Sequence, residues 1–130
     1  SRKALFDKLI RAGYGEAACE AALERLEQVG MVDDAALCAR LVDVMRHTRR
    51  WGHRKVRFEL RRRGIPEETV REALDDGFDD TENAVCQIRK KYAGGDLSDP
   101  KTRAKIAAGL NRLGFDYDTV RAAITVENFE

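Results

Sequence analysis

Three stretches of this chain carry the same pattern, and that repetition constrains the fold more than any other sequence feature. They are residues 8–23 (KLIRAGYGEAACEAAL), 59–74 (ELRRRGIPEETVREAL) and 109–124 (GLNRLGFDYDTVRAAI). The copies lie 51 and then 50 residues apart, near the periods of helical repeat arrays. Three positions recur in every copy: Leu9, Leu60 and Leu110; Gly13, Gly64 and Gly114; Leu23, Leu74 and Ile124.

The glycine in each copy predicts the end of a helix. Each follows a leucine-periodic run and precedes an apolar residue (Tyr14, Ile65 or Phe115), the order found where a left-handed residue ends a helix. We therefore expect a helix, a tight turn and a second helix in every copy. The helices should break near residues 13, 64 and 114, with the three leucines buried.

A further helix is predicted before the second and third copies. Leu37, Leu41 and Val44 recur at helical spacing, with Asp33 or Asp34 available as the N-cap. Ala84 and Ile88 repeat this pattern, and the break AGGDLSDP then offers Ser98 or Asp99 as a cap before Pro100.

These elements predict an all-α protein of eight helices without strands. Because a unit of three short helices buries little by itself, we expect tandem three-helix repeats to stack into an elongated, curved body. The predicted boundaries are 1–30 for a partial first repeat, 31–77 for the second and 78–130 for the third. The chain opens without Met on an amphipathic pattern, which predicts further sequence upstream of Ser1 and a first repeat without its N-terminal helix.

Composition excludes several classes of protein. Hydrophobic residues make up 43% of the 130 residues and charged residues 36%, a balance expected of a folded, surface-rich domain. There is no membrane-spanning apolar run and no signal-peptide pattern, so we expect a cytoplasmic protein. The three cysteines form no CxxC pair, which favours reduced, buried thiols over a disulfide framework.

Positive charge is concentrated in residues 45–64 (MRHTRRWGHRKVRFELRRRG). This stretch holds nine Arg or Lys residues and one acid, Glu59, whereas the rest of the chain holds fifteen basic and twenty-two acidic residues. Such asymmetry predicts an acidic partner, either a phosphate backbone or an acidic protein surface. A solvated helix face is the ordinary alternative for a shorter run.

The repeat separates core from surface in this stretch. Val56 and Leu60 align with buried positions, whereas Phe58 aligns with Asp7 and Ala108. We therefore expect Phe58 to be partly exposed within a basic arc, or to pack only against a neighbouring unit. Trp51 could stack on a base or close the core between helices, and packing is its commoner role. The predicted contact residues are Arg46, Arg49, Arg50, Arg54, Lys55, Arg57, Phe58, Arg61 and Arg62.

Enzyme chemistry has little support in the sequence. His47 and His53 lie inside the basic run with no carboxylate placed to orient them, and the cysteines and histidines lack zinc-ligand spacing. The AGGD segment is no phosphate-binding loop, and the Asp pairs at 33/34, 75/76 and 79/80 are explained by helix capping. We therefore expect no catalytic residue, metal or cofactor.

The sequence resembles the RecX family of bacterial recombination regulators. The resemblance lies chiefly in residues 32–74 (VDDAALCARLVDVMRHTRRWGHRKVRFELRRRGIPEETVREAL), with weaker copies before and after, and spans about Ser1 to Ile124. Its most specific parts are Asp33-Asp34, Trp51-Gly52, Glu59-Leu60 and Gly64-Ile65-Pro66, in that order.

The resemblance implies a non-catalytic regulator. RecX proteins are built from tandem three-helix repeats, bind the RecA filament on single-stranded DNA, and depress its ATPase, strand-exchange and co-protease activities in DNA repair and the SOS response. Some also bind DNA directly. We expect a monomer that contacts RecA, without a membrane partner. The alternative is a helical array that binds DNA or RNA independently of RecA.

Overall fold

The computed structural model describes residues 1–28 and 33–129 of the chain, and within these residues it contains helices but no strand. The all-α prediction is confirmed, and the eight predicted helices are all present among the described residues. They are α1 (Arg2–Arg11), α2 (Glu16–Gln28), α3 (Asp34–His47), α4 (His53–Arg62), α5 (Glu67–Leu74), α6 (Thr81–Lys91), α7 (Pro100–Arg112) and α8 (Tyr117–Phe129).

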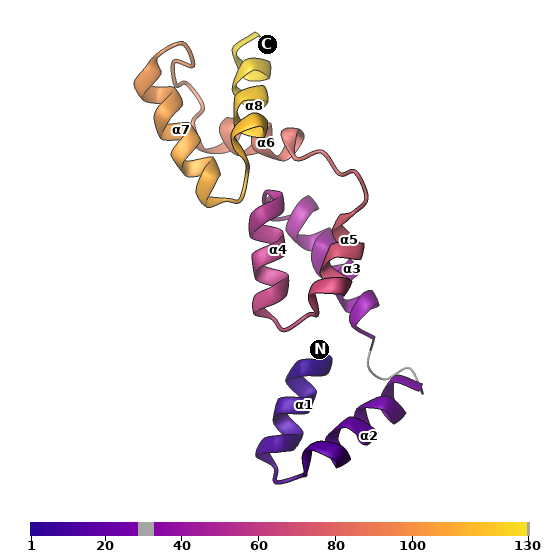
Figure 1. Cartoon of the computed structure of the whole chain (residues 1–130). Helices are drawn as coiled ribbons and strands as arrows, with labels where there is room; N and C mark the ends of the chain where they lie inside the picture. Colours follow the sequence, from indigo (N-terminus) through magenta and orange to yellow (C-terminus); the bar gives the residue numbers. More distant parts are fainter. Residues whose placement is uncertain (29–32, 130) are drawn as a thin grey trace.

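The helices form three successive groups along an elongated body (Figure 1). We call α1 and α2 unit one, α3 to α5 unit two, and α6 to α8 unit three. The predicted boundary between residues 30 and 31 lies outside the described residues. The boundary between residues 77 and 78 falls in the connection from α5 to α6 and stays a prediction.

The aligned glycines end the first helix of each hairpin, as predicted. Gly13, Gly64 and Gly114 have φ angles of 97°, 90° and 93°, in the left-handed region that favours glycine. In unit two the Ile65 amide donates to the Leu60 carbonyl at 3.2 Å and the Gly64 amide donates to Arg61 at 2.9 Å. This pair of bonds is the Schellman motif, which satisfies carbonyls at the helix end.

Two separate cores hold units two and three. The core of unit two comprises Cys38, Val42, Met45, Val56, Leu60, Ile65, Val70 and Leu74. The core of unit three comprises Ala84, Val85, Ile88, Ile106, Leu110, Phe115, Val120 and Ala123. Each unit therefore buries its own apolar stripe, and the units join through smaller contacts.

The burial prediction holds for Leu60 and Leu110 and is wrong for Leu9. Leu60 and Leu110 are 0% and 1% exposed, whereas Leu9 is half-buried and α1 has no buried residue. The reason is that α1 packs mainly against α2, whereas α4 and α7 each belong to a group of three helices.

The junction between units two and three is made by main chain. The Gly52 amide donates to the Leu113 carbonyl at 2.8 Å, and the Arg54 amide donates to the Gly114 carbonyl at 3.1 Å. The N-terminus of α4 thus lies on the turn between α7 and α8. A Cβ at Gly52 would lie 2.5 Å from the Gly114 carbonyl carbon, so only glycine permits this approach.

A related contact joins units one and two. The Ser1 hydroxyl donates to the Arg63 carbonyl at 3.4 Å, beside the turn between α4 and α5. By the repeat spacing, Ser1 corresponds to Gly52 and Arg63 corresponds to Leu113. The start of one hairpin therefore lies on the turn of the next hairpin at both junctions.

Replacing Gly52 should weaken the junction between units two and three. Gly52 has φ −83°, which alanine adopts without strain, so Gly52→Ala isolates the steric overlap with Gly114. We expect a loss of about 1–3 kcal/mol in the free energy of unfolding, the range typical of overpacking. Urea denaturation measures this loss. The control is Gly15→Ala, because nothing lies within 4 Å of a Cβ at Gly15. An equal loss in both variants would contradict the steric explanation.

Candidate interaction surface on α4 and α7

The predicted contact residues are divided among different environments. Arg46 lies inside the protein, Arg50 and Arg54 bridge units two and three, and Arg57 and Arg61 bridge α4 and α5. Arg49, Lys55, Phe58 and Arg62 lie on the outer side of this region, with Lys55 half-buried and the other three exposed. The structure therefore brings only part of the predicted set onto one open surface.

Arg46 is an internal cross-link. Its side chain is 7% exposed, and its two terminal nitrogens donate to the Asp76 carboxylate at 2.6 and 3.1 Å. The guanidinium carbon also lies 4.2 Å from the Phe78 ring centroid. The hydrogen bonds from Arg46 hold the pKa of Asp76 below its usual range. Arg46 follows buried Val42 by one helical turn, so it lies on the inner face of α3.

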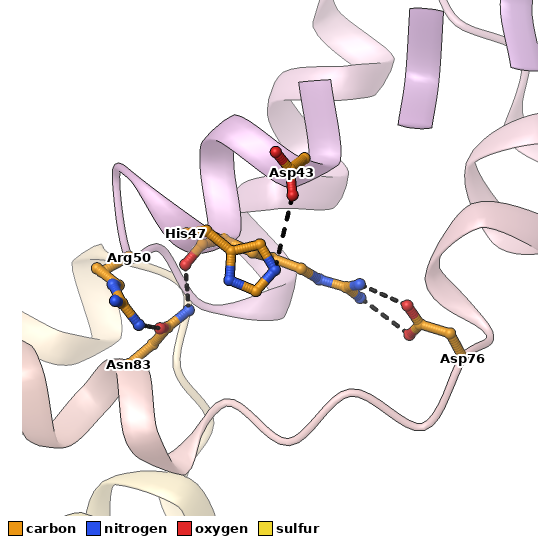
Figure 2. A network of polar contacts seen from close by, with 6 residues as sticks. Asp43, His47, Arg50, Asp76 and Asn83 are labelled. Atoms are coloured by element: carbon orange, nitrogen blue, oxygen red, sulfur yellow. Dashed lines mark hydrogen bonds and ion pairs between the residues drawn. The ribbon is translucent and has the colours of Figure 1, made fainter. Parts of the chain in front are cut away.

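Two buried amides of α6, Asn83 and Gln87, organise the turn between α3 and α4. The Asn83 side chain donates to the Arg46 carbonyl at 2.9 Å and accepts from Arg50 at 3.2 Å (Figure 2). The Gln87 side chain donates to the carbonyls of Arg49 and Arg50 at 3.2 and 3.0 Å. Arg50 has a positive φ of 56°, a left-handed conformation that these bonds support.

The Arg54 side chain adds to the junction with unit three. Its guanidinium donates to the Phe115 carbonyl at 3.0 Å and to the Asn111 side chain, both in unit three. Asp80 supplies a second contact, because its carboxylate accepts from the His53 amide at 2.7 Å and so caps α4. Burial raises the pKa of Asp80.

Arg57 and Arg61 are held by one carboxylate. Both guanidinium groups pair with Glu67 at the start of α5, and the distance from Arg61 is 3.3 Å. Arg61 also donates to the Ile65 carbonyl at 2.7 Å. We call this set, Arg57 and Arg61 with Glu67, the α4–α5 bridge. It reduces the excess charge that these arginines present to a partner.

The outer side of α4 and the end of α7 enclose an open groove. It has a volume of about 400 Å³. We call it the α4–α7 groove, and its lining residues are Arg54, Lys55, Phe58, Glu59, Asn111, Arg112 and Gly114. Phe58 is 64% exposed, which confirms the prediction made from the repeat alignment. An exposed ring among several cations is the feature that distinguishes this surface.

Trp51 belongs to the packing of unit two. It is half-buried against the core of that unit, and the Lys55 ammonium lies 4.6 Å from its ring centroid. The Arg49 guanidinium carbon lies 5.8 Å from the same ring. Both cations are within the range of cation–π attraction, so the ring holds them near the surface.

Sequence reasoning missed Arg112, which lies outside the basic run. The repeat alignment held the signal, because Arg11, Arg62 and Arg112 occupy the same position in the three copies. The sequence also led us to expect that helix capping alone explains the Asp pairs. Asp79 does cap α6 through Thr81, but Asp76 pairs with Arg46 and Asp80 caps the more distant α4.

The histidines and acidic residues form no evident reaction centre among the described residues. His47 Nε2 lies 3.9 Å from the Asp43 carboxylate, a longer separation than a hydrogen bond (Figure 2). Across residues 1–28 and 33–129, no three His, Cys, Asp or Glu side chains are arranged to hold a metal ion. Over the same ranges, every helix is too short or too polar to cross a membrane.

Comparison with known proteins identifies the class to which this helical array belongs. Residues 33–74 match the family model described as RecX, second three-helix domain, and residues 79–124 match RecX, third three-helix domain. The chain belongs to the RecX family.

Two relatives, each named Regulatory protein RecX, illustrate the sequence similarity. The protein from Stenotrophomonas maltophilia is 36% identical over 124 residues, which is 95% of this chain and 76% of the relative. The protein from Chlorobium phaeobacteroides is 33% identical over 124 residues, covering 95% and 82% of the two chains.

A solved structure has the same fold. The crystal structure of RecX from Lactobacillus salivarius superposes with a TM-score of 0.84 at 22% identity, covering 99% of this chain and 85% of that one. The match confirms the tandem three-helix architecture and the elongated body.

Removing the Asp76 carboxylate should change the pH dependence of stability. Because its folded-state pKa is lowered, the charged carboxylate contributes stability above the unfolded pKa of about 3.9 and loses it as pH falls through the folded pKa. Asp76→Asn should therefore be less stable than the parent at pH 7, and the gap should close at low pH. Urea denaturation at several pH values tests this. Asp75→Asn is the control, and a pH-independent gap for Asp76→Asn would contradict the assignment.

Proposed function

We propose that this chain is a cytoplasmic, non-catalytic regulator that binds the RecA filament and lowers its ATPase, strand-exchange and co-protease activities. The observation that carries the proposal is the α4–α7 groove, in which Phe58 is exposed among Arg54, Lys55 and Arg112. Family membership supports a regulatory role, since the relatives are named regulatory proteins. The contact groups themselves are our inference from charge, exposure and shape.

The arrangement of charges favours an acidic partner over a neutral one. Arg112 has no hydrogen-bond or ion-pair partner within residues 1–28 and 33–129. Arg62 pairs with Glu59 of its own helix, an exposed contact that a stronger acceptor can replace at little cost. An acidic surface that enters the groove therefore meets cations from both α4 and α7.

Phe58 gives the groove an apolar anchor. A large aromatic side chain surrounded by charged groups is a common centre of a protein interface, because burying the ring adds affinity and the charges add specificity. In this proposal RecA supplies an apolar contact for Phe58 and carboxylates for the flanking cations. In this complex RecA contacts both units two and three, because the α4–α7 groove is lined by residues of both.

Direct binding of single-stranded nucleic acid is the second candidate function. Phe58 favours it as well, because an exposed ring can stack on a base while neighbouring cations contact phosphates. Such binding would weaken as the salt concentration rises. A plot of log K against log[salt] would have a slope of about −0.7 for each phosphate that the protein neutralises. The two functions differ in whether RecA is needed.

The obvious charge reversal at Arg57 and Arg61 is a poor test. Both arginines pair with Glu67 in the α4–α5 bridge. Glutamates at both positions would gather three carboxylates and destabilise the contact between α4 and α5. Loss of activity in that variant would then reflect the fold as well as the interface.

Phe58→Ala combined with Arg112→Glu tests the groove without disturbing the fold. Both side chains are exposed and outside the cores, so the loss in unfolding free energy should be well under the ~3–5 kcal/mol of a buried Phe. We expect at least about a tenfold rise in the concentration that half-inhibits RecA-dependent ATP hydrolysis on single-stranded DNA, equivalent to about 1.4 kcal/mol.

The matched control makes the same changes away from the groove. Lys101→Glu with Phe129→Ala also removes one exposed ring and reverses one exposed charge. It should inhibit RecA as the parent does. Binding to a labelled single-stranded oligonucleotide without RecA separates the two functions: parallel losses would favour the nucleic-acid contact, and loss of inhibition alone would favour RecA. A folded groove variant with normal inhibition would disprove the proposed surface.

A further inference from the structure

A second groove lies on unit three, between α7 and α8, and borders the α4–α7 groove at Asn111. It has a volume of about 610 Å³ and an apolar floor that includes Ala107, Phe115 and Val120. Its remaining lining residues are Arg103, Ala104, Asn111, Tyr117, Arg121, Ile124 and Thr125. We call it the α7–α8 groove. It runs along two antiparallel helices of one hairpin.

Comparison with unit two explains why this groove is open. By the repeat spacing, Ala107 and Asn111 correspond to Arg57 and Arg61, and Tyr117 corresponds to Glu67. In unit two those three residues form the α4–α5 bridge, whose long side chains cross between the helices. Unit three has short or uncharged residues instead, and no ion pair among the described residues joins α7 to α8.

The other hairpin of the chain is also bridged. In unit one Arg2 of α1 pairs with Glu20 and Glu27 of α2. Both other hairpins thus carry an ion pair between their two helices. Among the described residues, the third hairpin carries no such ion pair and has an apolar groove between its helices. Apolar area left open in a groove of this size is typical of an interaction site.

The charges at the groove specify the occupant. Arg103 lies on α7 and Arg121 on α8, and both side chains are exposed. Within the described part of the chain, neither guanidinium has a hydrogen-bond or ion-pair partner. The groove therefore presents an apolar floor between two cationic groups and lacks a lining carboxylate.

We propose that the α7–α8 groove binds an amphipathic helical peptide whose apolar side chains enter the groove and whose flanking residues are acidic. Such a peptide would pack along α7 and α8 as a further helix, with its carboxylates next to Arg103 and Arg121. This site shares only Asn111 with the groove proposed for RecA, and its test needs no RecA.

A designed probe tests the proposal directly. The probe is a fluorescein-labelled peptide of about 15 residues with leucines at i, i+3, i+4 and i+7 and mostly glutamates elsewhere. The comparison peptide has the same sequence with every glutamate replaced by lysine. Fluorescence anisotropy with the full chain should show the acidic peptide binding at least about tenfold more tightly, because Arg103 and Arg121 attract its carboxylates.

Installing the bridge of unit two in unit three should close the groove. Ala107→Arg with Tyr117→Glu places an arginine and a glutamate where Arg57 and Glu67 stand in unit two, and it leaves the net charge unchanged. We expect it to weaken binding of the acidic peptide by at least about tenfold. The matched control is Ala108→Arg with Ala122→Glu, two exposed positions outside the groove, which should bind as the parent does.

A second variant keeps the test informative if the bridge variant unfolds. Arg103→Glu with Arg121→Glu alters only exposed side chains and should reverse the preference toward the lysine peptide. Circular dichroism and the thermal midpoint check the fold of every variant. Equal binding of the two peptides to the parent chain, or unchanged binding by a folded bridge variant, would overturn the proposal.

Discussion

The main-chain contact between Gly52 and the turn at Leu113–Gly114 is the constraint on which the relation of units two and three depends. Their cores are separate, so hydrophobic burial within each unit does not fix how the two are joined. Backbone bonds from Gly52 and Arg54 to that turn help to do so, together with the Arg54 side chain. The Asn83 and Gln87 side chains of α6 add hydrogen bonds to the end of α3 and the turn after it. Because no side chain intervenes at Gly52, the two backbones approach closely enough to form these bonds.

The basic stretch performs two tasks at once. Its arginines at positions 46, 50 and 54 tie unit two to the chain that follows, through Asp76, Asn83 and unit three. Those at 57 and 61 connect two helices of the same unit. The cations that remain on the open α4–α7 groove form a smaller set around Phe58, which includes Arg112 from another repeat. Total charge in the sequence therefore overstates the charge that a partner meets.

Much of the fold followed from the sequence because its signals are local. The glycine turns and the exposure of Phe58 needed only repeat spacing and helical periodicity, and both are observed. Leu9 was misjudged because burial depends on how many neighbouring helices cover a residue. The prediction of Arg46 as a contact residue was wrong because Arg46 pairs with Asp76 inside the protein. A run of arginines does not reveal which of them pairs with a carboxylate 30 residues further along the chain. The two grooves could not be predicted from the sequence, because each is lined by residues of two helices whose relative position the sequence does not give.

At the junction between units two and three, the start of α4 bonds to residues that the ribosome adds later than α4. The first amide of α4 is capped by Asp80, and the amides of Gly52 and Arg54 bond to Leu113 and Gly114. All of these acceptors are translated after α4 itself. Unit two can assemble its own core as soon as α5 has emerged, but the start of α4 gains its main-chain partners only when the hairpin of α7 and α8 has followed. A repeat that is synthesised later thus completes the one before it.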